Sequence, residues 1–182
     1  MTFTKIDYAL AGLIGFFAGI FAIPTLINLG HRNPLLLLGA PWVMALVLLI
    51  VLLIGGIFAR INPAFGQLAK FCVVGTLNAA IDFGMLNVFS LITGVTAGLL
   101  VGYFNVPGVS LAILNSYCWN KFWVFRNRSS QSVEDLPKFL IVTVSGLLLN
   151  SALVVVLTTY PPQIFPTGAV VWLDISKVVA AA

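Results

Sequence analysis

Long apolar runs constrain this chain more than any other feature of its sequence. Six such runs follow one another with short polar connectors, at residues 8–29, 35–58, 71–92, 97–119, 138–160 and from about 164 onward. About 20 apolar residues suffice for a helix to cross the hydrocarbon core of a bilayer. Only 8% of the residues are charged, against about 25% in soluble domains, so little solvated surface remains. The sequence predicts an all-α integral membrane protein of about six transmembrane helices, arranged as three hairpins.

The basic residues predict the orientation of these helices. If the N-terminus lies in the cytoplasm, the cytoplasmic segments hold most of the basic residues: Lys5, Arg60, Lys70, Lys121, Arg126, Arg128 and Lys138. The outer loops then carry Arg32 alone, while Lys177 lies within the last run. Because cytoplasmic loops of membrane proteins are enriched in lysine and arginine, we expect both termini in the cytoplasm.

Asp82 is a lone acidic residue in the middle of the run at residues 71–92. A rise of about 1.5 Å per residue from Lys70 places it about 18 Å deep, close to the centre of a ~30 Å hydrocarbon core. An acid at that depth is costly and usually has a function. A functional Asp82 would line a polar path or carry a coupling proton. The alternative is a protonated Asp82 that bonds to a neighbouring helix for packing alone.

Three asparagines are placed to accompany Asp82. Asn78 precedes it by one helical turn and shares its face. Asn105 stands beside Pro107-Gly108, which is either a break that frees a backbone carbonyl or an ordinary proline kink. A weak repeat, in which the third and fifth runs both begin with Lys-Phe, aligns Asn150 with Asp82. In the last run, Asp174 and Lys177 are three residues apart, so we expect them to form an intramembrane pair.

Several classes of chemistry are disfavoured. His31 is the only histidine, and Cys72 and Cys118 lack the spacing of a metal site. A histidine base or a multi-histidine metal site is therefore close to excluded. Nine basic residues scattered between apolar runs form no stripe for nucleic acid. We expect no catalytic residue, no metal and no cofactor.

Two motifs resemble the GtrA-like family of small four-helix bacterial membrane proteins. The first, in the third run, consists of Phe71, Gly75, Asn78 and Asp82. The second, at the end of the fourth run, consists of Tyr117, Asn120, Lys121, Trp123, Val124 and Phe125. The resemblance covers residues 67–182, and residues 1–66 add a transmembrane hairpin outside the usual core. The family's fourth helix normally ends in a second copy of the asparagine–basic–aromatic motif. Because the sequence stops at Ala182 before such a copy, we expect the core to be truncated or divergent there.

The resemblance implies a role in polyprenyl-phosphate-linked sugar pathways of the bacterial cell envelope. The expected function is translocation (flipping) of a lipid-linked sugar across the cytoplasmic membrane for cell-surface polysaccharide synthesis. Sugar hydroxyls would follow a substrate path formed by Asn78, Asp82, Asn105 and Asn150. The lipid phosphate would be received at the cytoplasmic boundary by polar and aromatic residues: Lys70, Asn120, Lys121, Trp123 and Arg126. Alternatively, these boundary residues anchor helix ends and set the topology.

Two other functions stay open from the sequence. One is a non-catalytic scaffold that recruits or anchors a polyprenyl-phosphate glycosyltransferase through the loop at residues 120–138. The other is a small proton-coupled exporter in which Asp82 carries the proton. The expected partners are the bilayer, the lipid-linked sugar, a glycosyltransferase and a second copy of the chain, because glycines and alanines in the spans permit close helix approach.

Overall fold

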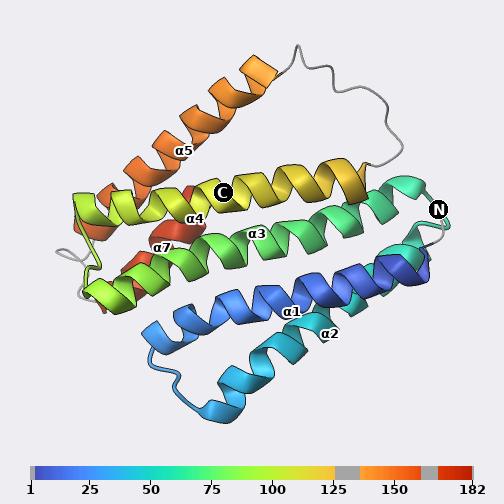
Figure 1. Cartoon of the computed structure of the whole chain (residues 1–182), viewed down its shortest axis with the longest axis horizontal. Helices are drawn as coiled ribbons and strands as arrows, with labels where there is room; N and C mark the ends of the chain where they lie inside the picture. Colours follow the sequence, from blue (N-terminus) through green and yellow to red (C-terminus); the bar gives the residue numbers. More distant parts are fainter. Residues whose placement is uncertain (1–2, 126–135, 161–167, 182) are drawn as a thin grey trace.

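The computed structural model describes residues 3–125, 136–160 and 168–181, and these residues form helices and no strand. The elements are α1 (Lys5–Asn28), α2 (Pro34–Phe58), α3 (Pro63–Thr93), α4 (Leu99–Trp119), the π-helical turn η1 (Asn120–Val124), α5 (Leu136–Thr159) and α7 (Ala169–Ala181) (Figure 1). The prediction of an all-α membrane protein is confirmed.

Four helices are long and apolar enough to cross a membrane, namely α1, α2, α3 and α4 continued by η1. Helix α5 has 24 residues and thus the length of a span. Helix α7 has 13 residues, so it rises only about 20 Å against a ~30 Å hydrocarbon core. The predicted start of the last run, near residue 164, lies outside the described residues.

Local sequence signals set the helix ends. The Thr4 hydroxyl accepts a hydrogen bond from the Asp7 backbone N–H, and the Asp7 carboxylate accepts one from the Thr4 backbone N–H, which is a capping box. Asn33 and Asn62 cap α2 and α3, and each is followed by a proline in the first turn. Gly94 ends α3 with φ 71°, a left-handed conformation that suits glycine. Pro107 lies inside α4, which continues through it.

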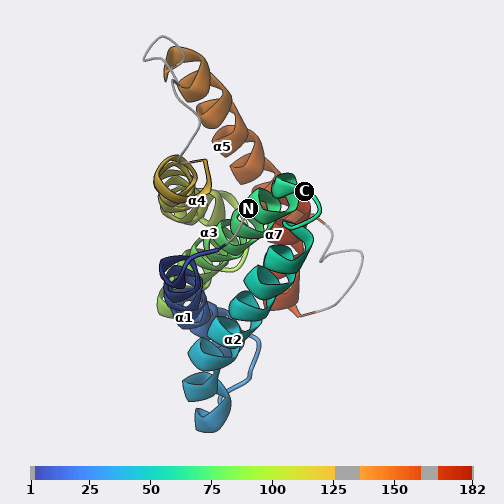
Figure 2. The same ribbon diagram turned by 90° about the vertical axis from the view of Figure 1, so that its right-hand side faces the viewer.

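Helix α3 lies at the centre of the bundle (Figures 1 and 2). The hairpin of α1 and α2 packs on one side of α3, and α4 runs antiparallel to α3 on another. Helix α5 lies close to α4 and α7 at its C-terminal end and diverges from the bundle toward its N-terminal end. The short helix α7 runs from one end of the bundle to about the middle of its long axis (Figure 1). This arrangement divides the apolar packing into two cores.

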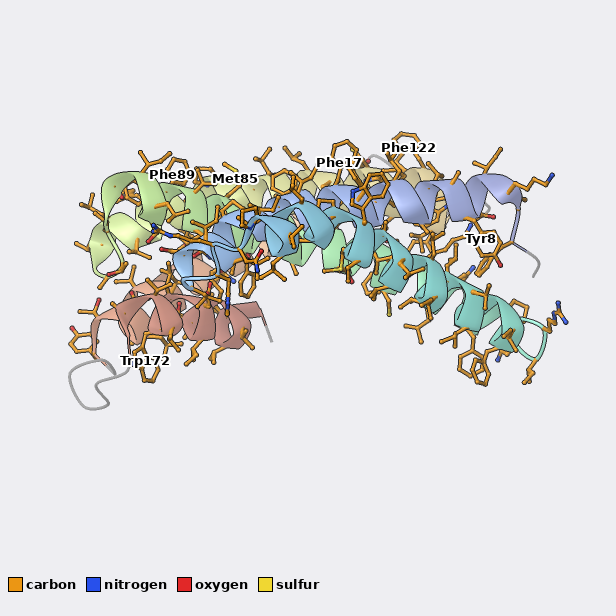
Figure 3. All side chains as sticks on the ribbon, turned by 90° about the horizontal axis from the view of Figure 1, so that it is seen from below. Tyr8, Phe17, Met85, Phe89, Phe122 and Trp172 are labelled. Atoms are coloured by element: carbon orange, nitrogen blue, oxygen red, sulfur yellow. The ribbon has the colours of Figure 1, made fainter. Side chains whose placement is uncertain are left out.

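The larger core joins α1, α2, α3, α4 and η1 through small and branched side chains such as Ala11, Leu52 and Val73. The smaller core joins α3, α4, α5 and α7 through Leu86, Val101, Val154 and Leu173. Figure 3 shows Met85, Phe89 and Trp172 toward one end of the bundle, and Tyr8 toward the end that holds the N-terminus. The polar side chains described below lie at both ends and between the two cores.

Gly84 sets how closely α1 approaches α3. A Cβ atom at this position would collide with the backbone carbonyl of Phe21 on α1. Gly75, on the same helix, has no atom within 4 Å of the place where a Cβ would stand. The two glycines therefore form a matched pair, one in a close helix contact and one in open space.

We predict that Gly84→Ala destabilises the protein by about 1–3 kcal/mol, because α1 must move away from α3. Gly75→Ala should be neutral or stabilise by up to about 1 kcal/mol, since alanine has the higher helix propensity. Denaturant unfolding of the purified protein in detergent micelles measures both. Equal stabilities for the two variants would contradict the close contact.

Candidate functional site

A buried lysine lies at the centre of the polar groups inside the bundle. The Lys177 side chain, on α7, has no exposed surface. Its Nζ lies 2.6 Å from Asp82 Oδ2 on α3, and it donates a hydrogen bond of 2.5 Å to Asn105 Oδ1 on α4. An ammonium group buried in the membrane requires such partners, because an unpaired charge there is strongly unfavourable.

Asn105 extends this contact to α5. Its Nδ2 donates to Asn150 Oδ1 and to Ser151 Oγ, both at 2.9 Å. Asn150 Nδ2 in turn donates to the backbone carbonyl of Ala180 on α7 at 2.9 Å. We call Asp82, Asn105, Asn150, Ser151 and Lys177 the central network. It connects four helices across the smaller apolar core.

Gly108 brings α3 and α4 together at Asp82. A Cβ atom at Gly108 would lie 3.0 Å from the Asp82 backbone oxygen and 3.2 Å from Asp82 Oδ1. The Pro107-Gly108 pair thus lies beside Asp82. Asp82 Oδ1 is buried and has no hydrogen-bond partner, so the carboxylate is held at one oxygen only.

Asp174 belongs to a separate outer cluster around Asn87. The fully buried Asn87 accepts from Asn28 Nδ2 at 2.7 Å and donates to Asp174 Oδ1 at 2.9 Å and to Thr25 Oγ1 at 3.1 Å. The second Asp174 oxygen is buried without a partner. The predicted pairing of Asp174 with Lys177 is therefore corrected: both residues bond to other helices. The i, i+3 rule describes neighbours on one helix surface, whereas α3 and α4 offer Lys177 a carboxylate and an amide oxygen.

Asn78 does not join the central network. It accepts a hydrogen bond from Asn115 Nδ2 at 2.7 Å, and Asn115 Oδ1 accepts one from Trp119 Nε1 at 3.0 Å. Asn115 and Trp119 border a groove of about 190 Å³ between α1, α3 and α4, whose other lining residues are Leu13, Ile14, Phe17, Phe21, Leu77 and Ile81. Of the predicted substrate path, the structure brings Asp82, Asn105 and Asn150 together, whereas Asn78 is bonded to Asn115, which lines this apolar groove.

Two of the predicted boundary residues are bound to a carboxylate that the sequence reasoning passed over. Asp7 Oδ1 accepts hydrogen bonds from Lys70 Nζ at 2.5 Å and from Trp123 Nε1 at 2.9 Å. Lys70 and Trp123 are only 5% and 6% exposed. Because Asp7 neutralises Lys70 inside the bundle, this contact fixes α1 to α3 and η1. The spacing of Thr4 and Asp7 just before an apolar run, which is typical of a capping box, is the sequence signal that could have identified an ordered acid there.

The other boundary residues differ in exposure. Lys121 is exposed, and its Nζ donates to the Tyr117 hydroxyl at 3.0 Å. Asn120 Nδ2 donates to Ser116 Oγ at 3.1 Å, while its Oδ1 is buried without a partner. Arg126 lies outside the described residues. Across residues 3–125, 136–160 and 168–181, no three His, Cys, Asp or Glu side chains gather in a group fit for a metal ion.

The comparison with known families agrees with these sequence motifs. The family described as "GtrA/DPMS, transmembrane domain" matches residues 70–181. This chain belongs to that family. The N-terminal hairpin of α1 and α2 lies outside the match, and the central network lies within it. The chain is accordingly a multi-pass membrane protein.

Two relatives share part of the sequence. The uncharacterized membrane protein YngA of Bacillus subtilis is 30% identical over 91 residues, which are 50% of this chain and 58% of that protein. A dolichol-phosphate mannosyltransferase of Pyrococcus furiosus is 32% identical over 85 residues, which are 46% of this chain and 23% of that protein. The chain thus spans less than two thirds of either relative. No solved structure matches it significantly.

We predict that Asp7→Ala destabilises the protein by roughly 3–5 kcal/mol, because it leaves the Lys70 ammonium buried and unpaired. Adding Lys70→Met should recover a large part of this loss, since the double variant buries no charge. Lys121→Met serves as the control and should stay close to wild type, because Lys121 is exposed. Denaturant unfolding in detergent measures these three variants and Lys70→Met alone. Simple additivity of the two single substitutions would contradict a coupled pair.

Proposed function

We propose that this protein moves a polyprenyl-phosphate-linked sugar across the bacterial cytoplasmic membrane for cell-surface polysaccharide synthesis. Its family fits a membrane protein of polyprenyl-phosphate sugar pathways, and one relative is by name a dolichol-phosphate mannosyltransferase. In this proposal both termini lie in the cytoplasm, as the basic residues predict. The chain itself catalyses no reaction and uses no cofactor.

The central network is the observation that carries the proposal. A sugar in hydrocarbon loses its hydrogen bonds to water, at a cost of several kcal/mol for each unpaired group. Asn105, Asn150 and Ser151 offer amide and hydroxyl groups that both donate and accept, and Asp82 adds a free carboxylate oxygen. These groups bond to one another in the described arrangement, and sugar hydroxyls would replace those bonds in transit.

The lipid part of the substrate has different requirements. Its isoprenoid chain is apolar, and the groove between α1, α3 and α4 offers an apolar lining with Asn115 and Trp119 at its edge. At the cytoplasmic boundary we assign the first contact with phosphate to Lys121, together with Asn120 and with Arg126, which is five residues further along the sequence. Lys70 and Trp123 take no direct part in this proposal, because Asp7 already occupies them.

A scaffold for a glycosyltransferase is the second candidate. The stretch shared with the mannosyltransferase makes up 23% of that protein, so the similarity is confined to a minor portion of a protein named for glycosyl transfer. A scaffold would need the boundary residues and not the central network. A proton-coupled exporter would need Asp82 without any preference for lipid phosphate. A homo-oligomer is compatible with each candidate.

Transbilayer movement of a polyprenyl-phosphate sugar in liposomes that contain the purified protein tests the proposal. We predict movement with wild type and with Thr76→Ala, a half-buried position on α3 whose hydroxyl donates to the Cys72 backbone carbonyl. Asp82→Ala and Asn105→Ala should reduce the rate at least about tenfold, equivalent to about 1.4 kcal/mol of lost stabilisation. Absence of movement by the wild type with several sugars would contradict translocation and favour the scaffold. If both network variants moved the lipid at the wild-type rate, the network would have a role in helix packing alone.

A further inference from the structure

The two buried ion pairs in the described part of the chain, Asp7–Lys70 and Asp82–Lys177, differ in how firmly each carboxylate is held. Asp7 accepts hydrogen bonds from Lys70, from Trp123 and from the backbone and hydroxyl of Thr4. Asp82 is bound at one oxygen by Lys177, and its other oxygen is buried with no partner. A carboxylate with four donors is a fixed structural anion. A carboxylate with one donor is a replaceable partner.

The charges around Lys177 permit such a replacement. Helices α4 and α5 present neutral groups to the network: Asn105, Asn150 and Ser151. Helix α3 presents Asp82, and α7 itself carries Asp174, which is bonded to Asn87 in the outer cluster. Asp82 is thus the anion that balances Lys177 among the described residues. If another anion binds Lys177, the negative charge of Asp82 is no longer neutralised.

We propose that Lys177 is the binding group for the phosphodiester anion of the transported lipid, and that Asp82 occupies its place when no substrate is bound. This inference rests on the proposed function. A phosphodiester carries one negative charge, like the carboxylate that it displaces, and its oxygens accept charge-assisted hydrogen bonds from the ammonium group. Asn105 Oδ1 stays available to orient Lys177 during the exchange.

The exchange is balanced by one proton. Before binding, the Asp82 carboxylate neutralises the Lys177 ammonium. After binding, the phosphodiester neutralises Lys177, and Asp82 takes one proton from the medium to become a neutral carboxylic acid. No covalent bond other than this O–H forms or breaks. Because a charge left unpaired at this depth is strongly unfavourable, proton uptake and anion binding are linked one to one.

Isothermal titration of the whole protein in detergent with farnesyl methyl phosphodiester tests this exchange. The probe keeps one negative charge throughout the pH range, so a pH dependence reports on the protein. We expect wild type to bind about tenfold more tightly for each pH unit lowered while Asp82 is ionised, as one linked proton requires. Titration in two buffers of different ionisation enthalpy should show one proton taken up per probe bound.

Substitutions separate the two members of the pair. Asp82→Asn removes the competing anion, so binding at pH 7 should be at least about tenfold tighter than in wild type. Adding Lys177→Gln to that variant removes the cation and should abolish the gain, while Lys177→Arg alone should retain binding. The double variant buries no unpaired charge, which keeps the comparison valid if Lys177→Gln alone does not fold. Asp174→Asn should leave the proton uptake intact.

Two further probes identify the ligand chemistry. Farnesol lacks the anion, and dimethyl phosphate lacks the lipid chain. Binding of the phosphodiester lipid but not of farnesol supports an anion site, and binding of dimethyl phosphate with the same Lys177 dependence would assign the site to the head group alone. Equal affinity of Asp82→Asn with and without Lys177→Gln, or wild-type binding without proton uptake, would overturn the inference. Lys177-dependent binding without transport in liposomes would refute translocation and leave the anion site standing.

Discussion

The ion pair of Lys177 and Asp82 is the interaction on which the rest of the core depends. An ammonium group with no exposed surface must have an anion beside it, and Asp82 on the central helix α3 supplies that anion. The pair draws the short helix α7 against α3. Asn105 then turns its amide toward Lys177 and α5, and the close contact at Gly108 brings α4 to the same place. One charge pair thereby determines where four helices meet.

The N-terminal hairpin has a different role. It lies outside the family match, yet it packs on α3 and supplies Asp7 to Lys70 and Trp123. Those two contacts tie α1 to the first part of α3, through Lys70, and to η1 at the end of α4, through Trp123. The hairpin also supplies one wall of the apolar groove through residues such as Leu13 and Phe17. It is therefore an integral part of this bundle.

The helices and several of the polar contacts could be predicted from the sequence, because each depends on local information. Apolar runs define the spans, counting residues from Lys70 gives the expected depth of Asp82, and the Lys-Phe repeat aligns Asn150 with Asp82. The partner of Lys177 could not be predicted in this way. The spacing of Lys177 from Asp174 indicates a shared helix face, whereas its observed partner, Asp82, lies 95 residues earlier in the sequence. Pairing between helices follows from packing, which a single sequence does not display.

Asn78 and Lys70 show the same limit. Asn78 shares a helix face with Asp82, but one turn along α3 the neighbouring side chain is Asn115, beside the apolar groove. Lysine is a residue type that often binds phosphate, but the Lys70 ammonium group donates its hydrogen bond to Asp7 on α1. In both cases the contact that decides the role of the residue comes from another helix.

The central claim is that the network around Lys177 is a passage and not only a packing contact. Water access at Ser151 measures this directly. Cys72 and Cys118 are both exposed, so they are first replaced by serine, and Ser151→Cys then carries the only thiol. A small, membrane-impermeant thiol reagent is added to proteoliposomes from either side, with and without a lipid-linked sugar. We predict that the thiol at position 151 is modified from each side of the membrane in turn, and that substrate changes the ratio of the two modification rates. A thiol that stays unreactive from both sides under every condition, in folded protein, would contradict it.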